Sequence, residues 1–335
     1  MKKIYKALAV ITAALIACFA FAACGDNTAD TGSAASQDSK YKIGIIQYVS
    51  HPSLDNCYNG IVEALKADST IEIERQIGSD ASPDSDCAAY AQNMIKSGCD
   101  MIIAIATPAA TSAFAAADGT DVPVIFCAVS DPEKAEIVES NDAPGYNCTG
   151  TSDVLDLSAQ LDLIQAMQPD VKSVGILYTA SEANSISNLE VMKKIADERG
   201  INIDAVSVNN AADIPSAATA LAARVDCINN FTDNNVVNNL SVVVEAATNA
   251  GIPVYGSEVE QVKNGCLAAV SIDYVALGKV TGNMALDVKG GASAATMAVK
   301  TISDATPVVN TDVLAKLNIQ MPAAYANAET VTTNS

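Results

Sequence analysis

The stretch Met101-Ile102-Ile103-Ala104-Ile105-Ala106 runs directly into Thr107-Pro108-Ala109-Ala110. Six consecutive apolar residues predict a strand that is buried on both faces of a sheet. Thr107 is suited to cap the N-terminus of a helix, and proline is favoured at the first helical position, which Pro108 would occupy. A buried strand that leads straight into a helix is the repeating unit of a parallel α/β fold.

The same alternation of apolar strands and amphipathic helices continues on both sides of this stretch and restarts after residues 150–151. Strands are expected at residues 41–47, 71–77, 101–106, 122–129, 173–178, 203–208, 225–231, 253–256, 268–272 and 301–310. Helices are expected at residues 51–67, 87–97, 108–117, 154–167, 185–198, 213–224, 235–249, 275–289 and 312–317. This pattern predicts an α/β fold with two successive βα modules of similar size.

The N-terminus has the pattern of an export signal. Lys2, Lys3 and Lys6 form a basic start, and an apolar run extends from Ala7 to Ala23. Small residues before Cys24 predict cleavage there, so that residues 1–23 are a signal peptide. An uncleaved transmembrane helix is the alternative, although 17 apolar residues are at the short limit for spanning a bilayer.

Cys24 resembles the lipidated cysteine of the bacterial lipoprotein lipobox, with Phe21 where leucine is usual. Cys18 fits the same pattern less well, because cleavage there would leave an apolar stub. Residues 24–40 are small and polar, as is typical of a flexible tether. We therefore expect an extracytoplasmic protein anchored to the cell membrane by a lipid on Cys24.

The charge of the chain limits its possible partners, and its length indicates the number of domains. The chain has 19 basic and 39 acidic residues, a formal net charge of −20. A surface this acidic repels phosphate backbones, so nucleic acid is not an expected partner. The roughly 295 residues after the tether suffice for two domains that each bury a core.

Enzyme classes are poorly supported. His51 is the only histidine, and its place before a proline at a helix start favours an N-terminal cap over catalysis. The sequence has no GxSxG elbow and no GxxxxGK phosphate loop. Seven cysteines remain besides Cys18 and Cys24, mostly within apolar runs, which favours buried thiols over a disulfide framework. We expect no catalytic residue, metal or cofactor.

Ligands in open α/β sheets bind beyond the carboxyl ends of the strands, and several loops there are polar. The N–H groups of Ala109 and Ala110 would form an anion seat at a helix start, with simple capping as the alternative. Asp233 follows an apolar strand, where it would either pair with a ligand ammonium or cap a helix. An anion seat in one module and a cation partner in the other fit an amino acid bound between two lobes.

Short segments dispersed through both modules match one known family. They are residues 42–48, 51–55, 105–110, 130–132, 150–153, 181–185, 232–234 and 272–282. Together they cover residues 41–320 and resemble the ABC transporter substrate-binding proteins of the tryptophan and tyrosine uptake type.

The resemblance implies two Rossmann-like lobes with parallel sheets, joined by crossover strands in a type I periplasmic-binding-protein-like fold. The crossovers are expected near residues 149–152, 271–274 and 301–309. One lobe would comprise residues 41–150 with about 273–300, and the other residues 151–272 with about 301–320. Residues 321–335 would form a polar tail. The lobes would close on the ligand and dock on an ABC permease.

The expected ligand-binding residues follow from the polar loops and the resemblance. They are Gln47, Tyr48, Thr107, Ala109, Ala110, Ser130, Asp131, Ser152, Asn184, Ser185, Asp233, Asn234, Glu258 and Asp273. Thr107 and the two alanine amides would hold the carboxylate, and Asp233 the ammonium. Because the chain has no tryptophan, ring stacking would come from Tyr48, Tyr178 or Phe231, each of which fits core packing equally well.

The sequence thus predicts a lipoprotein that captures a small, aromatic amino acid and delivers it to an ABC importer. The main alternative is a sugar, nucleoside or other solute on the same scaffold. A sensor lipoprotein that presents its ligand to a membrane receptor is a second alternative, and an enzyme is the weakest.

Overall fold

The computed structural model describes residues 40–302 and 305–334. The predicted signal peptide, Cys24, Cys18 and the tether up to residue 39 lie outside the described residues. Within the described ranges, no helix combines the length and apolar character needed to cross a membrane.

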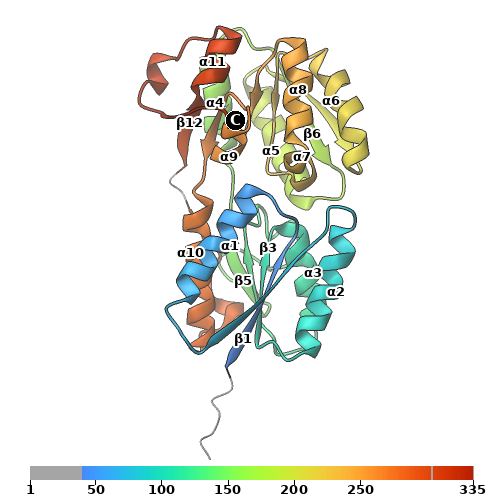
Figure 1. The fold of residues 1–335 in the computed structure, drawn as a ribbon, viewed down its shortest axis with the longest axis vertical. Helices are drawn as coiled ribbons and strands as arrows, with labels where there is room; N and C mark the ends of the chain where they lie inside the picture. The colour runs from blue at the N-terminus through green and yellow to red at the C-terminus, as the bar shows by residue number, and fades with distance from the viewer. Residues whose placement is uncertain (1–39, 303–304, 335) are drawn as a thin grey trace, which may run out of the picture. The chain divides into compact units, whose positions relative to one another are not determined.

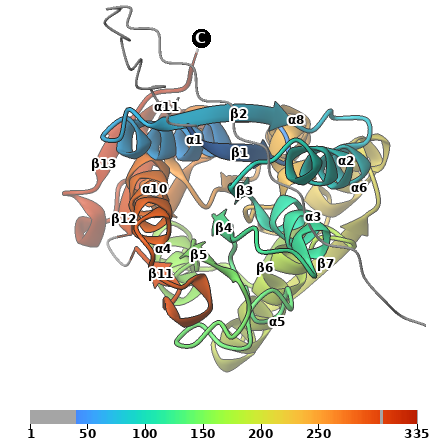
Figure 2. The same cartoon turned by 90° about the horizontal axis from the view of Figure 1, so that it is seen from below.

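The first lobe is built on a six-stranded sheet with the order β11-β5-β4-β3-β1-β2, and its neighbouring strands pair in parallel. Its strands are β1 (Tyr41–Gln47), β2 (Ile71–Ile77), β3 (Met101–Ile105), β4 (Val124–Cys127), β5 (Cys148–Ser152) and β11 (Lys300–Thr301). Helices α1 (Pro52–Leu65) and α10 (Tyr274–Lys289) cover one face, and α2 (Pro83–Lys96) and α3 (Thr107–Ala117) cover the other (Figure 2). The continuously apolar strands are therefore buried on both sides.

The second lobe contains a four-stranded parallel sheet with the order β7-β6-β8-β9 and a three-stranded sheet with the order β10-β12-β13. Its strands are β6 (Ser173–Thr179), β7 (Asn202–Val208), β8 (Cys227–Asn229), β9 (Val254–Tyr255), β10 (Ala268–Ser271), β12 (Thr306–Asn310) and β13 (Glu329–Val331). Its helices are α4 (Leu157–Met167), α5 (Ala183–Glu198), α6 (Ile214–Ala222), α7 (Asn234–Asn238), α8 (Leu240–Ala250), α9 (Val259–Lys263) and α11 (Thr311–Leu317). Helices α6 and α8 pack together on one side of the parallel sheet, and α4 and α5 on the other (Figure 1).

The chain passes between the two lobes three times: after β5, between β10 and α10, and between β11 and β12. In each lobe the loops after the parallel strands face the other lobe (Figure 1). The topology therefore brings the carboxyl ends of two sheets together, which is where an open α/β sheet binds ligands.

The structure differs from the sequence prediction at several elements. Strand β5 continues to Ser152, beyond the expected lobe boundary at residue 150. The helix expected at residues 235–249 is divided at Asn239 into α7 and α8. Residues 321–335 are not simply a tail, because β13 pairs in parallel with β12. Strand β13 is only 3 residues long with a single large apolar side chain, so no periodic pattern marks it.

The cysteines lie where the sequence analysis placed them. Cys57, Cys87, Cys99, Cys127, Cys148, Cys227 and Cys266 are all buried, and none forms a disulfide within the described residues. Several pack in the hydrophobic cores of the two lobes beside isoleucine and valine side chains. They behave as small apolar core residues.

Candidate functional site

Two neighbouring cavities lie between the lobes and share Asn234. The inner cavity is lined by His51, Thr107, Ser130, Asp153 and Tyr274 from the first lobe, and by Asn184, Thr232, Asn234 and Gln261 from the second, among others. It measures about 20 Å³, which is room for about one water molecule. The outer cavity measures about 620 Å³, within the range of roughly 300–1,000 Å³ typical of small-molecule sites.

The turn between β3 and α3 reaches the inner cavity with an unusual backbone. Ala106 has φ 80° and ψ 154°, a conformation that is essentially restricted to glycine. Ala128, at the end of β4, also has a positive φ of 57° and lines the same cavity. Such strain persists only where the surrounding structure enforces it, and it concentrates at functional sites.

The helix start here differs by one residue from the sequence prediction. Ala106 is the N-cap, so Thr107 and Pro108 are the first two helical residues. The amide of Ala110 donates to Ala106 O at 3.0 Å and is not available to a ligand. The amides of Thr107 and Ala109 precede the first intrahelical bond and are left without a helical acceptor. The main-chain amides left without a helical acceptor at this helix start are thus those of Thr107 and Ala109 rather than those of Ala109 and Ala110.

Asp153 is the acidic group of the inner cavity. It is only 3% exposed and accepts hydrogen bonds from Ser130 Oγ at 2.9 Å and from the Tyr274 hydroxyl at 2.8 Å. Burial raises its pKa, because the charged form loses its hydration, and no cationic side chain in the described part of the chain forms an ion pair with it. A buried carboxylate that has hydrogen-bond donors but no cationic partner is suited to a ligand cation.

Three polar atoms in the same cavity lack a hydrogen-bond partner. They are Nδ1 of His51, Oδ1 of Asn184 and Oγ1 of Thr232, all buried and without a partner among the described residues. Buried polar atoms are rarely left unsatisfied in folded proteins, since each costs about 1–3 kcal/mol. Of the six such side-chain atoms among the described residues, three belong to residues that line this one cavity.

The lobes are joined across the cavities by polar contacts. His51 Nε2 lies 3.3 Å from Asn234 Oδ1, and Asn238 Nδ2 donates to Asp80 Oδ1 at 3.3 Å. Ser187 Oγ also donates to Asp131 Oδ2. These contacts connect the two lobes across the cavities.

The outer cavity is polar and acidic. Tyr48 is the one aromatic side chain in its lining, and Asp80, Asp84 and Glu182 supply carboxyl groups. Most of the remaining lining residues are serines and asparagines.

Asp233 caps a helix and does not line either cavity. Its carboxylate accepts hydrogen bonds from the main-chain and side-chain groups of Thr179, from Ser185 Oγ and from Val236 N. These bonds, at 2.6–3.0 Å, occupy both oxygens. Asp233 is therefore a helix cap, which is the alternative that the sequence left open. Ser185 donates a hydrogen bond to Asp233 and does not line either cavity.

Other expected residues also support the site from outside the cavities. Gln47 binds Val49 O and Asp55, and Ser152 donates to Ser130 O. Asp273 caps α10 by accepting from Val275 N and Ala276 N. Five expected residues line a cavity: Tyr48 the outer one, Thr107, Ser130 and Asn184 the inner one, and Asn234 both, whereas Ala109 and Asp131 line neither.

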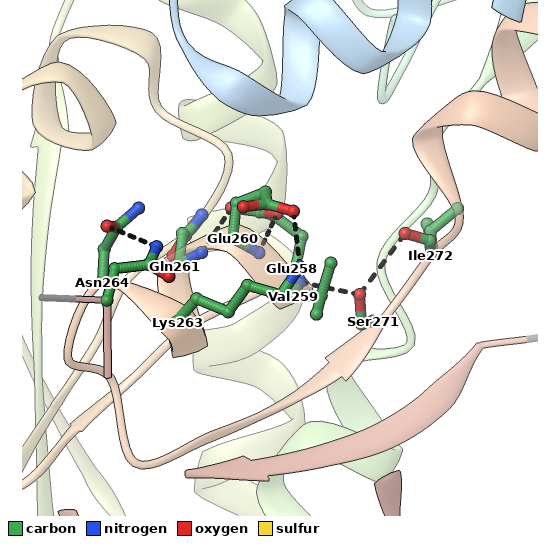
Figure 3. Close-up of polar contacts among 9 residues, drawn as sticks. Glu258, Val259, Glu260, Gln261, Lys263, Asn264, Ser271 and Ile272 are labelled. Carbon is green, nitrogen blue, oxygen red and sulfur yellow. Dashed lines mark hydrogen bonds and ion pairs between the residues drawn. The ribbon is translucent and has the colours of Figure 1, made fainter. Parts of the chain in front are cut away.

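Glu258 is a helix cap as well. Its carboxylate accepts from Glu260 N at 2.7 Å and from Gln261 N at 2.8 Å, at the first turn of α9 (Figure 3). Ser271 Oγ accepts from Val259 N on the same turn and ties α9 to β10. Glu258 thereby orients Gln261, whose side chain reaches the inner cavity.

Burial raises the pKa of Glu258 to about 7. Because the native carboxyl binds its proton more tightly than the unfolded one, its contribution to stability is present below about pH 4.3 and is lost as the pH rises to about 7. We expect the free energy of unfolding to fall with pH in this window more steeply in the wild type than in Glu258→Gln. The two slopes should differ by at most about 1.4 kcal/mol per pH unit, the largest effect that one titrating group can have. Denaturant titrations at several pH values measure this, and equal slopes would contradict it.

Sequence reasoning missed several residues of the inner cavity. His51 has the expected N-cap position of α1, yet its side chain caps nothing and points to Asn234 of the other lobe. Asp153 lay within a segment that carried the family resemblance but was not among the expected ligand residues. Thr232 and Tyr274 were not expected either, although they are adjacent in the sequence to the expected residues Asp233 and Asp273. Their grouping depends on the crossovers, which local patterns do not reveal.

Comparisons with known proteins show the family and the fold. The family model described as ABC transporter substrate binding protein matches residues 42–331. A tyrosine-binding protein of Clostridioides difficile is 31% identical over 333 residues, covering 97% of this chain and 95% of that protein.

Two solved structures share the fold at 33% identity, each covering 88% of this chain and 100% of the other. One is an ABC domain from Streptococcus pneumoniae in complex with L-Trp, with a TM-score of 0.84. The other is a ligand-free, open substrate-binding protein with adhesive properties from Clostridium difficile, with a TM-score of 0.67. The present structure is therefore closer to the ligand-bound relative than to the open one.

Proposed function

The chain belongs to the family of ABC transporter substrate-binding proteins, with a type I periplasmic-binding-protein-like fold, and we propose that it captures an aromatic amino acid for an ABC importer. Relatives similar over nearly the whole chain support this ligand class, since one is a tyrosine-binding protein and another was solved with L-Trp. The protein acts by binding and release, with no catalytic step.

The observation that carries the proposal is the inner cavity, where an unpaired buried carboxylate lies among unsatisfied polar atoms from both lobes. Asp153 would pair with the ligand ammonium, in place of Asp233. The free amides of Thr107 and Ala109 at the start of α3 would bind the carboxylate, aided by the helix dipole. Tyr48 would contact the part of the side chain that reaches the outer cavity.

Ligand binding would be coupled to lobe movement. The inner cavity lies between two segments that cross between the lobes, since Asp153 follows β5 and Tyr274 begins α10. A ligand that satisfies groups on both lobes favours the arrangement in which they are close, so contacts in the cavity would drive closure.

We also propose that a lipid on Cys24 anchors the protein outside the cytoplasmic membrane. The basic start, the apolar run and the small residues before Cys24 support it. The polar residues 24–40 would give the binding lobes enough reach to meet a permease in the same membrane.

A thermal-shift series tests the ligand class. At 100 times its dissociation constant, L-tryptophan or L-tyrosine should stabilise residues 25–335 by about 2.7 kcal/mol. Sugars and nucleosides serve as the comparison, because they lack the zwitterionic end that the cavity fits. A shift with a sugar or nucleoside and none with either aromatic amino acid would overturn the proposal.

A further inference from the structure

The second lobe reaches the inner cavity through two asparagines whose amide groups share one acceptor. Nδ2 of Asn184 donates to Glu182 Oε2 at 3.2 Å, and Nδ2 of Asn234 donates to the same oxygen at 2.7 Å. The main-chain N–H of Asn234, which can only donate, points to this oxygen at 3.1 Å. Oε2 of Glu182 is therefore an acceptor, and Oε1 likewise accepts from the main-chain N–H of Asn235 at 3.3 Å.

This acceptor decides which end of each amide faces the ligand. The nitrogen of Asn184 is held by Glu182 and by Thr232 O at 3.2 Å, which leaves its buried Oδ1 without a partner at the cavity. The nitrogen of Asn234 is held by Glu182 in the same way, so its Oδ1 faces His51 across the gap between the lobes. Both asparagines thus present oxygen rather than nitrogen.

The orientation of Asn234 in turn determines where His51 carries its proton. Burial lowers the pKa of His51 to about 4, so the ring is neutral and has a single N–H. Because Asn234 Oδ1 can only accept, that N–H is on Nε2, 3.3 Å away. Nδ1 of His51 is then a bare acceptor, and it lies buried and unpartnered at the inner cavity.

We infer that Glu182 is a positioning residue that gives the inner cavity its hydrogen-bond polarity. Acting through Asn184 and through the Asn234–His51 contact, it presents acceptors from both lobes beside the carboxylate of Asp153. This inference rests on the proposed function and deepens it, because a cavity lined with acceptors selects a ligand with several N–H donors. A protonated amine has three, and the same molecule without its amino group lacks all three at that end.

Two substitutions of Glu182 separate this role from simple support of the fold. Glu182→Gln keeps an amide oxygen in the place of Oε2, whereas Glu182→Met has a similar length but no acceptor. The control is Asp226→Ala, which removes acceptors for Lys172 N and Ser173 N at the opposite end of β6 from the cavity. Calorimetry measures the affinity for L-tryptophan relative to indole-3-propionate, which lacks the amine.

The ratio of the affinity for L-tryptophan to that for indole-3-propionate should be unchanged in Glu182→Gln and in Asp226→Ala. In Glu182→Met this ratio should fall about tenfold or more, as expected for loss of hydrogen bonds to a charged group. An unchanged preference in Glu182→Met would overturn the inference. Failure of the wild-type protein to bind L-tryptophan or L-tyrosine would instead count against the proposed function.

A second measurement needs no ligand. Since His51 is the only histidine in the sequence, ¹⁵N NMR of the protein without a histidine tag reports its tautomer directly. We expect Nε2–H in the wild type and in Glu182→Gln, and a mixture of tautomers in Glu182→Met. If Glu182→Met does not fold, Asn234→Ala interrupts the same contacts and should also give a mixture. A wild-type ring protonated on Nδ1 would refute the inference.

Discussion

Replacing Asp153 by asparagine is expected to weaken the binding of L-tryptophan or L-tyrosine about 30-fold or more. The substitution keeps the size of the side chain but removes the negative charge that we assign to the ligand ammonium. Loss of one partner from a buried, hydrogen-bonded charge pair typically costs 2–5 kcal/mol or more. Calorimetry on the folded variant measures the change.

The same substitution should raise the stability of the ligand-free protein, because it removes a carboxyl group whose burial is not offset by a cation among the described residues. Asp156→Ala is the matched control, since Asp156 lies on the same crossover but only caps α4. It should lose stability and keep its affinity for the amino acid. Equal affinities of Asp153→Asn and the wild type would show that the ammonium binds elsewhere.

The sequence was most informative where strands are continuously apolar. The burial of β3 and β4 on both faces follows from their composition, and the helix after β3 follows from Pro108. Short elements such as α9 and β13 have too few residues to show a period and depend on tertiary contacts. The position of the N-cap at Ala106 could not be expected, because its φ of 80° is strained for alanine.

The candidate site was only partly predictable for a related reason. Thr107, Ser130, Asn184 and Asn234 follow strands, and the general position of ligand sites in α/β sheets points to them. Asp233 follows a strand equally well, but Thr179 and Ser185 occupy its oxygens, which only the folded structure shows. Asp153 and Tyr274 come together because two crossovers meet, and their separation of 121 residues hides this from local patterns.

Close packing of α1 against α10 leads to the second prediction of large effect. A Cβ atom on Gly278 of α10 would lie 2.1 Å from Cys57 O of α1, and one on Gly60 of α1 would lie 2.1 Å from Val275 O of α10. The backbones therefore touch at these glycines, and neither carbonyl can move without shifting its helix. Gly278→Ala should destabilise the protein by about 3 kcal/mol, as expected for strong overpacking.

The effect should extend to the ligand, because both helices begin at the inner cavity: His51 precedes α1, and Tyr274 is the first residue of α10. If the helices are forced apart, Tyr274, which donates to Asp153, moves relative to His51, which faces Asn234. Gly290→Ala, at the other end of α10, is the control, since its nearest atoms are 3.3 Å away on the same helix and its φ is −73°. Denaturant unfolding and calorimetry of both variants provide the measurement. If Gly278→Ala were as stable as Gly290→Ala, the helix contact could not be what fixes the distance between His51 and Tyr274.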